Sequence, residues 1–185
     1  MPARPAGALE VGERVWLREP TARDRDEIIA RARASRTLHR SWASAPGTLE
    51  QFSDWMKPNR LATVQPFLVC RRDDGAIVGV IRLSQIFRKG FQNAYMGYYA
   101  FAPYAGQGYM REGMQLVLRH VFRVMKLHRL EANIQPGNDR SIVLARKSGF
   151  RREGFSPRYL KIAGRWRDHE RWAITLEDWR ARRRS

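Results

Sequence analysis

The sequence predicts a single mixed α/β domain, in which helices cover the faces of a mixed sheet. Short apolar runs rich in β-branched and aromatic residues alternate with segments whose apolar residues recur at helical spacing. Their order is strand, helix, three strands, helix, strand, helix and two strands. The 185 residues, 43% of them hydrophobic, suit one core, and no repeat or long linker divides them. We therefore expect residues 1–185 to form one domain.

The first half of the chain predicts a strand, a helix and a β-hairpin. Residues 14–18 (RVWLR) alternate as in a strand, and residues 21–35 have the pattern of a helix. Residues 39–60 mix turn-forming with aromatic residues, which predicts a loop and a short helix. Residues 66–86 predict two strands joined at Asp74-Gly75, a strong hairpin signal.

The second half predicts strands that alternate with helices. In chain order, the expected elements are a strand over 93–103, a helix over 110–125, a strand over 128–136, a helix over 138–150 and strands near 151–155 and 171–176. The helix over 110–125 has apolar residues three or four apart, the spacing of one buried face. Pro103 ends the strand before it because proline cannot donate to a sheet.

The composition is strongly basic. There are 35 Lys and Arg residues against 18 Asp and Glu, a formal net charge of +17. Such a surplus favours anionic partners, among them nucleic acid, ribosomes, acidic peptides and a polyphosphate cofactor. The run RARRRS at residues 180–185 is expected to be a short, solvated basic tail.

Cysteine usage and hydropathy indicate a cytoplasmic protein. Cys70 is the single cysteine, so an intramolecular disulfide framework and a cysteine metal cage are excluded, and its apolar surroundings predict a buried strand residue. No secretion signal and no apolar run long enough for a membrane span are present, so we expect no membrane contact. No cluster of His and acidic residues has metal-ligand spacing, and we expect no metal.

Two glycines mark the junction between a predicted strand and a predicted helix. Gly106 and Gly108 lie within PYAGQGYMREGM, residues 103–114. Helix N-termini present unpaired N–H groups and the positive end of the helix dipole, and a phosphate can reach them where no Cβ intervenes. A plain tight turn would also explain the pair. A dinucleotide-binding fingerprint does not fit, because Arg111 stands where its third glycine would fall, and a P-loop does not fit, because the loop lacks Gly-Lys-Ser/Thr.

The strand, the loop, the helix and the segment LHRLEANIQPGNDRSIVLARKSGFRREGF together resemble the GNAT superfamily of acetyl-CoA-dependent N-acetyltransferases. The second half, with YLKIAGRWRDH, is most similar to the RimJ-type ribosomal-protein N-terminal alanine acetyltransferases. The resemblance covers nearly all of residues 14–179. The family's loop pattern is Q/R-x-x-G-x-G/A, and this chain departs from it with Ala105 at the Q/R position and Met110 at the final G/A position. The resemblance implies the GNAT fold: a mixed, mostly antiparallel sheet of about seven strands flanked by helices.

The resemblance implies a site for acetyl-CoA. The pyrophosphate would lie at the loop and the start of the helix, on Gly106 and on the amides of Gln107, Gly108, Tyr109, Met110 and Arg111. The end of the preceding strand, Tyr99, Ala100 and Phe101, would pair with the pantetheine arm. A strand amide near Phe101 would stabilise the oxyanion of the transfer step.

The helix over 138–150 would supply the rest of the cofactor site. By resemblance, Asn138 bonds the pantetheine region and Ser141 protonates the departing thiolate; ordinary helix capping is the alternative for both. Arg146 would meet the nucleotide phosphates, or else lie on a solvated helix face.

The general base is harder to place. Some relatives have an acid directly before the Tyr of the YL pair, where this chain has Arg158. Glu131 is then the candidate base, with a structural ion pair to a nearby Arg as its alternative. Tyr159 would act at the catalytic centre or contact the acceptor, unless it is a core aromatic. Asp168 and His169 are expected to be structural.

Trp42 is expected to line the acceptor groove, with core packing as the alternative. Trp55 and Phe52 are weaker candidates for the same role.

The leading hypothesis is an N-terminal α-amine acetyltransferase that acts on a peptide or protein, possible acceptors including a ribosomal protein. It would act as a monomer or homodimer. Two other hypotheses stay open: an N-acetyltransferase for a small amine such as an aminoglycoside, and a basic ribosome- or RNA-binding protein without catalysis. The positive charge argues against a cationic small substrate.

Overall fold

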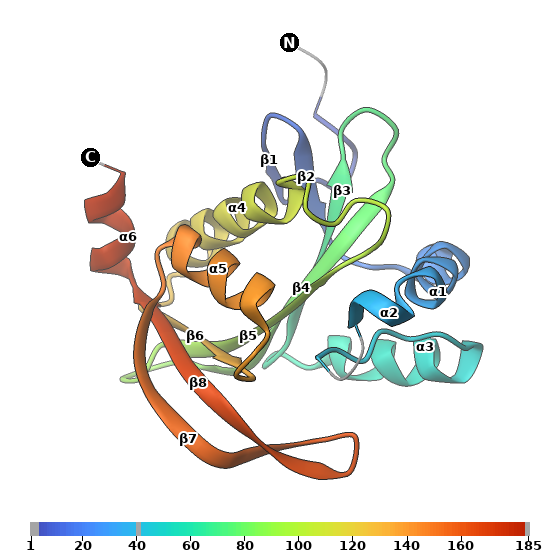
Figure 1. The fold of residues 1–185 in the computed structure, drawn as a ribbon. Coiled ribbons are helices and arrows are strands. Elements are labelled where there is room, and N and C mark those ends of the chain that lie inside the picture. Colours follow the sequence, from blue (N-terminus) through green and yellow to red (C-terminus); the bar gives the residue numbers. More distant parts are fainter. Residues whose placement is uncertain (1–3, 40–41, 184–185) are drawn as a thin grey trace.

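A computed structural model describes residues 4–39 and 42–183 of the chain. One eight-stranded sheet has the order β1-β2-β3-β4-β5-β6-β8-β7 (Figure 1). Its strands are β1 (Glu10–Val11), β2 (Val15–Arg18), β3 (Gln65–Arg71), β4 (Ile77–Phe87), β5 (Asn93–Ala100), β6 (Arg129–Ile134), β7 (Arg151–Ile162) and β8 (Arg165–Thr175). All neighbours are antiparallel except β5 and β6, which are parallel.

Helices cover both faces of this sheet, as the sequence predicted. They are α1 (Arg25–Ala34), α2 (Arg36–His39), α3 (Leu49–Met56), α4 (Tyr109–Arg123), α5 (Asp139–Ser148) and α6 (Leu176–Arg182), with short 3₁₀ segments at Ala22–Asp24 and Lys57–Arg60. Helices α4 and α5 lie on one side of the sheet and α1 to α3 on the other (Figure 1). Among the described residues, no helix is long and apolar enough to span a membrane.

Strand β3 explains why one run of the sequence is apolar without alternation. Phe67 and Val69 pack against the α4 side, whereas Leu68 and Cys70 pack against the α1–α3 side, and all four are fully buried. Because both faces of the strand are covered, every position can be apolar. Cys70 is fully buried within β3, as predicted, and this burial raises the pKa of its thiol to about 11.

The sheet opens between β5 and β6. The two strands pair only at Asn93, Ala94 and Tyr95 of β5. Beyond Tyr95, β5 continues along β4 to Ala100, while β6 continues along β8. The main-chain groups of β5 that face β6 therefore lack a neighbouring strand along its second half.

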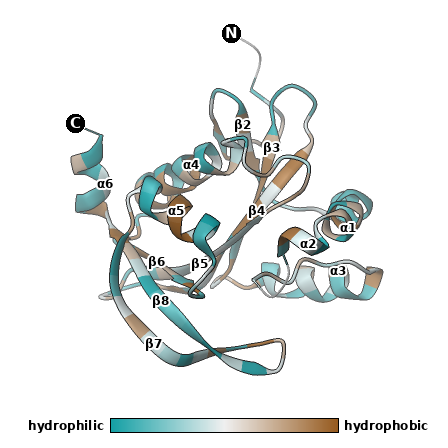
Figure 2. Ribbon diagram, in the orientation of Figure 1, coloured by the Kyte–Doolittle hydropathy of each residue, from teal (hydrophilic) through white to brown (hydrophobic). Residues whose placement is uncertain are grey.

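Three parts of the fold differ from the sequence-based expectation. Strand β1 adds an eighth strand. Strands β7 and β8 form one long hairpin, mostly hydrophilic in Figure 2, whose two-residue turn has positive φ at Ala163 (+48°) and Gly164 (+78°). Ala-Gly fits such a turn less well than Asn-Gly, so this hairpin has only a weak turn signal in the sequence.

The expected solvated tail is in part a helix. Helix α6 includes Arg180 to Arg182, begins with a capping box between Thr175 and Asp178, and buries Trp179 against Phe122 with ring centroids 5.5 Å apart. Residues 180–182 are exposed, as expected of a solvated segment, but they are helical. Residues 184 and 185 lie outside the described residues.

Candidate active site

The loop before α4 has the backbone that its two glycines permit. Gly106 and Gly108 have φ of +82° and +84°, and Gly108 is the N-cap of α4 without any side-chain cap. A Cβ at Gly106 would meet nothing within 4 Å, and one at Gly108 would meet only Arg14 Nη1, at 3.6 Å. The glycines are thus needed for the left-handed conformation, and the space above them is open.

The amides at the start of α4 are unpaired. Within the described residues, no hydrogen bond uses the N–H of Gln107, Gly108, Tyr109 or Met110. The N–H of Arg111 differs, because it donates to Gly108 O at 3.1 Å. Four free donors therefore point out of the N-terminus of a 15-residue helix, where an anion is favoured.

Arginines from distant parts of the chain surround this loop. Arg14 Nη1 donates to Gln107 O at 3.1 Å, and the Arg14 guanidinium lies 4.2 Å from the Tyr109 ring centroid. Arg31 lies 4.8 Å and Arg71 5.5 Å from the Tyr104 ring centroid. These residues precede β2 or lie in α1 and β3, so no local pattern in the sequence could place them at the loop.

Fewer main-chain groups of β5 are free to bind a ligand than the sequence predicted. The N–H of Phe101 donates to Val78 O at 2.8 Å, so it is already used within the sheet. Successive residues alternate sides, so the main-chain groups of Tyr98 and Ala100 face the opening toward β6. His39 Nε2 donates to Ala100 O at 2.7 Å. The Ala100 N–H and the main chain of Tyr98 stay available.

Ser141 and Tyr98 meet beside this opening. Ser141 Oγ donates to the Tyr98 hydroxyl at 2.9 Å, and that hydroxyl donates to Ser141 O at 3.0 Å. Burial raises the pKa of Tyr98 to about 12, against the opposing effect of its bond to Ser141. The sequence predicted Ser141 as a site residue but not Tyr98. The one local indication for Tyr98 was that it lies two residues after Met96 and so shares its strand face.

The side chains of the other two residues predicted at α5, Asn138 and Arg146, form no hydrogen bond or ion pair with a described residue. Asn138 precedes the helix without a side-chain cap bond, so its amide is available to a ligand. Arg146 is exposed and has no ion pair with a described residue. A basic hollow lies nearby, between α4, α5 and α6. It is lined by Arg111, Gln115, Lys147, Ser148, Trp179, Arg182 and Arg183.

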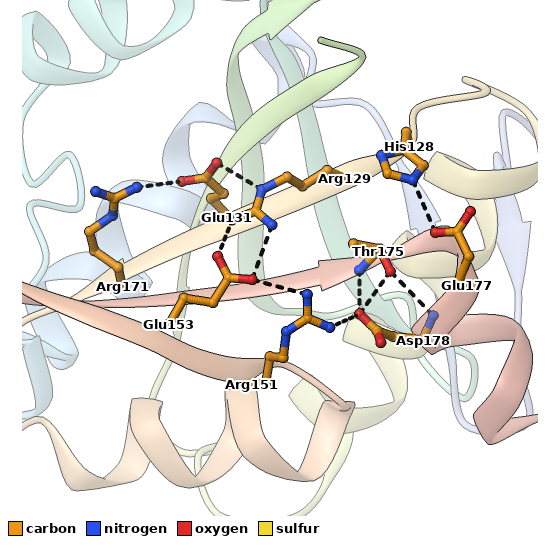
Figure 3. Close-up of polar contacts among 9 residues, drawn as sticks. All are labelled: His128, Arg129, Glu131, Arg151, Glu153, Arg171, Thr175, Glu177 and Asp178. Atoms are coloured by element: carbon orange, nitrogen blue, oxygen red, sulfur yellow. Dashed lines mark hydrogen bonds and ion pairs between the residues drawn. The ribbon is translucent and has the colours of Figure 1, made fainter.

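Glu131 is held in an ion-pair network (Figure 3). Only 4% of Glu131 is exposed, and its Oε1 accepts from Arg129 Nε at 2.9 Å and from Asn93 Nδ2 at 3.1 Å. Arg171 Nη2 lies 3.8 Å from the other carboxylate oxygen. Arg129 also pairs with Glu153, which raises the pKa of Arg129 above its usual range. These contacts therefore favour a structural ion pair, rather than a general base, as the role of Glu131.

Two residues predicted to contact the acceptor lie near the opening. Trp42 Cη2 would be 3.8 Å from a Cβ at Gly137, next to the start of α5. The pKa of Tyr95 is raised mainly by burial and also by its hydrogen bond with Tyr159, which places Tyr159 at β5.

Asp168 and His169, which were expected to be structural, make contacts within the β7–β8 hairpin. Asp168 accepts from the N–H of Arg158 at 2.7 Å. His169 is buried, with Nδ1 3.0 Å from Arg167 O.

Comparisons with known proteins agree with this geometry. Residues 14–151 match the model of the acetyltransferase (GNAT) domain. The chain belongs to the GNAT acetyltransferase family. This confirms the resemblance drawn from the sequence.

Relatives of this GNAT chain include RimJ-type enzymes. The [ribosomal protein uS5]-alanine N-acetyltransferase of Escherichia coli (strain K12) is 38% identical over 107 residues, which are 58% of this chain and 55% of that protein. The chain thus spans about half the length of that curated relative. The structure of Mycobacterium smegmatis RimJ in complex with CoA-disulfide has a TM-score of 0.79 and 28% identity, covering 89% of this chain and 83% of that one.

A spermidine N-acetyltransferase shares the fold alone. The structure from Vibrio cholerae in complex with CoA and spermine has a TM-score of 0.76 but 19% identity, and the match covers 90% of this chain and 98% of that one. Family membership therefore leaves the acceptor to be argued from the residues of this GNAT chain.

Proposed function

We propose that this GNAT chain transfers the acetyl group of acetyl-CoA to the N-terminal α-amine of a protein, with an alanine of a ribosomal protein as the leading acceptor. The observation that carries the proposal is the set of four unpaired amides at the N-terminus of α4, next to the opening between β5 and β6. The names of the RimJ-type relatives support the class of acceptor.

Bound acetyl-CoA supplies an activated thioester. The amides of Gln107 to Met110 would hold its pyrophosphate, with Gly106 providing the turn. The main chain of Tyr98 and Ala100 would pair with the pantetheine arm. Tyr99 and Phe101, which both pack on the α1–α3 side of the sheet, would hold this strand end in place. The side-chain amide of Asn138, which makes no cap hydrogen bond, would bind the same arm.

Basic side chains would hold the nucleotide. The side chains of Arg111 and Lys147, with Arg182 beside them, line a hollow that suits a phosphate group. Arg146 lies one position before Lys147 on α5 and adds positive charge to this side of the molecule.

The chain needs little help to activate an α-amine. An α-amine with a pKa of about 8 is neutral in roughly one molecule in ten at pH 7, whereas a lysine amine is neutral in about one in a few thousand. A water molecule leading to a carboxylate would suffice as the base. Glu131 is the acid nearest the start of the opening, but its ion pairs support a positioning role more than proton transfer.

Proton return to the leaving group falls to Ser141 in this proposal. Its hydroxyl is held by Tyr98 at the wall of the opening, and it would turn from Tyr98 to the sulfur as the carbon–sulfur bond breaks. The N–H of Ala100, which faces the opening, would stabilise the oxyanion in place of the Phe101 amide, because the Phe101 N–H already donates to Val78 O. Trp42 and Tyr159 would border the acceptor.

The direct test is incubation of the purified chain with acetyl-CoA and peptides that start with Ala, Ser or Thr, followed by mass spectrometry. Spermidine and an aminoglycoside serve as competing acceptors. The proposal predicts one added acetyl group on a free N-terminus and none on the same peptide with a blocked N-terminus. Acetylation of the small amines with no gain on any peptide would contradict the proposed acceptor.

A further inference from the structure

Strand β5 has a bare position on the α1–α3 side of the sheet. Gly97 is exposed although it lies within a central strand, and a Cβ built there would meet nothing within 4 Å. Tyr95 and Tyr99 lie two residues away on the same strand face. Pairing of β5 with β6 has ended by Gly97, so this open space borders the opening where the thioester is proposed to lie. A glycine in a strand interior is typical of a place where a ligand approaches the backbone.

Arg82 stands directly beside this space. It is the cross-strand partner of Gly97 on β4, and paired residues of antiparallel strands point to the same face. The guanidinium lies 5.9 Å from the Trp55 ring centroid, so it extends along the wall that α3 forms. The side chain is half-buried.

No counter-ion accompanies Arg82. Among the described residues, none of the carboxylates forms an ion pair with it, and burial lowers its pKa, opposed only by Tyr99. Glu131, on the neighbouring strand, is already bound by Arg129, Asn93 and Arg171. The Tyr99 hydroxyl is buried, and Trp55 is the one described side chain that interacts with it through a hydrogen bond, which is too poorly aligned to satisfy the group.

The Arg82 guanidinium and the Tyr99 hydroxyl both lose hydration, and the Trp55 contacts that they make supply no negative charge in return. Arg presents its N–H donors as a planar fork that matches a carboxylate, and the Tyr hydroxyl can add one more donor. A cationic acceptor such as a polyamine would be repelled from the same place. The missing partner is therefore an anion that arrives with the acceptor.

We propose that Arg82 and Tyr99 form an anion-binding subsite of the acceptor site, which selects acceptors that carry a carboxylate close to the reacting amine, such as a peptide with Asp or Glu in its first residues. The inference rests on the proposed function, since it takes the space over Gly97 as the acceptor side. It names the substrate class more narrowly than the family does.

Binding and turnover are measured separately. Peptides that start with Ala carry Glu or Gln at position two, three or four and are otherwise identical. Their affinity for the CoA-bound protein, which cannot transfer acetyl, is measured by calorimetry. Their kcat and KM with acetyl-CoA are measured in parallel. The variants are Arg82→Gln and, as a matched control, Arg60→Gln, which removes the same charge from an exposed position near α3.

We expect at least one Glu peptide to bind about tenfold or more tightly than its Gln counterpart, the usual range for hydrogen bonds to a charged group. Arg82→Gln should remove this preference through KM, with kcat for the Gln peptide little changed, and Arg60→Gln should keep it. Arg82→Lys, which retains the charge without the fork, should keep part of it and stands in if the Gln variant does not fold.

Equal binding of every Glu and Gln pair to the wild-type protein overturns the subsite, as does a preference that survives in both Arg82 variants. Acid-selective binding without any acetylated peptide would instead contradict the proposed function and leave the subsite supported. The two failures are thus distinguishable.

Discussion

The hydroxyl groups of Ser141 and Tyr98 lie 2.9 Å apart and connect α5 to β5 beside the opening of the sheet. Since the pKa of Tyr98 is raised to about 12, this phenol stays protonated over any practical assay range. The pair therefore keeps its proton and its geometry independent of pH.

Ser141→Ala is expected to lower kcat about 100-fold, within the range for loss of a general acid, with little change in the KM for acetyl-CoA. Tyr98→Phe should lower kcat less, because it acts through the position of Ser141. The double variant should be no worse than Ser141→Ala alone, since the residues act as one unit. Steady-state kinetics test this, with the exposed Ser53→Ala as the control. An unchanged kcat in Ser141→Ala would remove the proton-donor role.

Gly108→Ala is expected to weaken CoA binding and to cost about 1–2 kcal/mol of stability, because an L-residue at φ +84° is disfavoured. Gly154→Ala is the matched control: this glycine lies in β7, has no positive φ and has open space around it. Calorimetry and thermal unfolding report the two effects. Full CoA affinity in Gly108→Ala would mean that the loop backbone does not form the phosphate site.

Arg182→Gln is expected to raise the Kd for CoA several-fold and to leave that for dephospho-CoA unchanged, if the hollow between α4, α5 and α6 holds the nucleotide phosphate. The difference should shrink at high salt. Arg180→Gln is the control, because Arg180 faces a different hollow on the same helix. Equal losses for both ligands would place the phosphate elsewhere.

Glu153 gives a pH-dependent contribution to stability. Its hydrogen bond with Arg129 is the largest of the effects that lower its pKa below the ordinary 4.5. A carboxyl with a lowered pKa in the folded state stabilises the protein above its unfolded-state pKa, and that stabilisation is lost as the pH falls through the folded-state value. Glu153→Gln should therefore lose less stability than the wild type between pH values of about 5 and 3. Urea unfolding over this range, with the exposed Glu13→Gln as control, measures it. Parallel curves for Glu153→Gln and the wild type would contradict the ion pair.

Glu131→Gln distinguishes a structural carboxylate from a base. Removing one partner of a buried ion pair costs about 3–5 kcal/mol. We expect a loss of this order in the free energy of unfolding, because Arg129 and Arg171 lose their shared partner. The rate per folded molecule should fall little at neutral pH. A large fall in kcat that deepens at low pH, with stability retained, would restore the role of general base.

How much of this site the sequence could predict depends on how local each signal is. The loop at Gly106 and Gly108 was predictable, because left-handed glycines before an amphipathic helix are a local pattern. Arg14 was not predictable, since only the tertiary fold brings it to Gln107. Arg82 was not placed opposite Gly97 either, because the register of β4 and β5 shifts between Ser84 and Phe87. The basic composition of residues 180–185 concealed Trp179, whose burial makes α6 part of the fold.

Calorimetric titration of the folded wild-type chain with CoA tests the central claim, that the amides of residues 107–110 bind a diphosphate at the opening of the sheet. We expect saturable heat with a stoichiometry of one, and we expect Gly108→Ala, but not Gly154→Ala, to weaken the binding. Absence of any heat at millimolar CoA, in a protein shown to be folded, would contradict it.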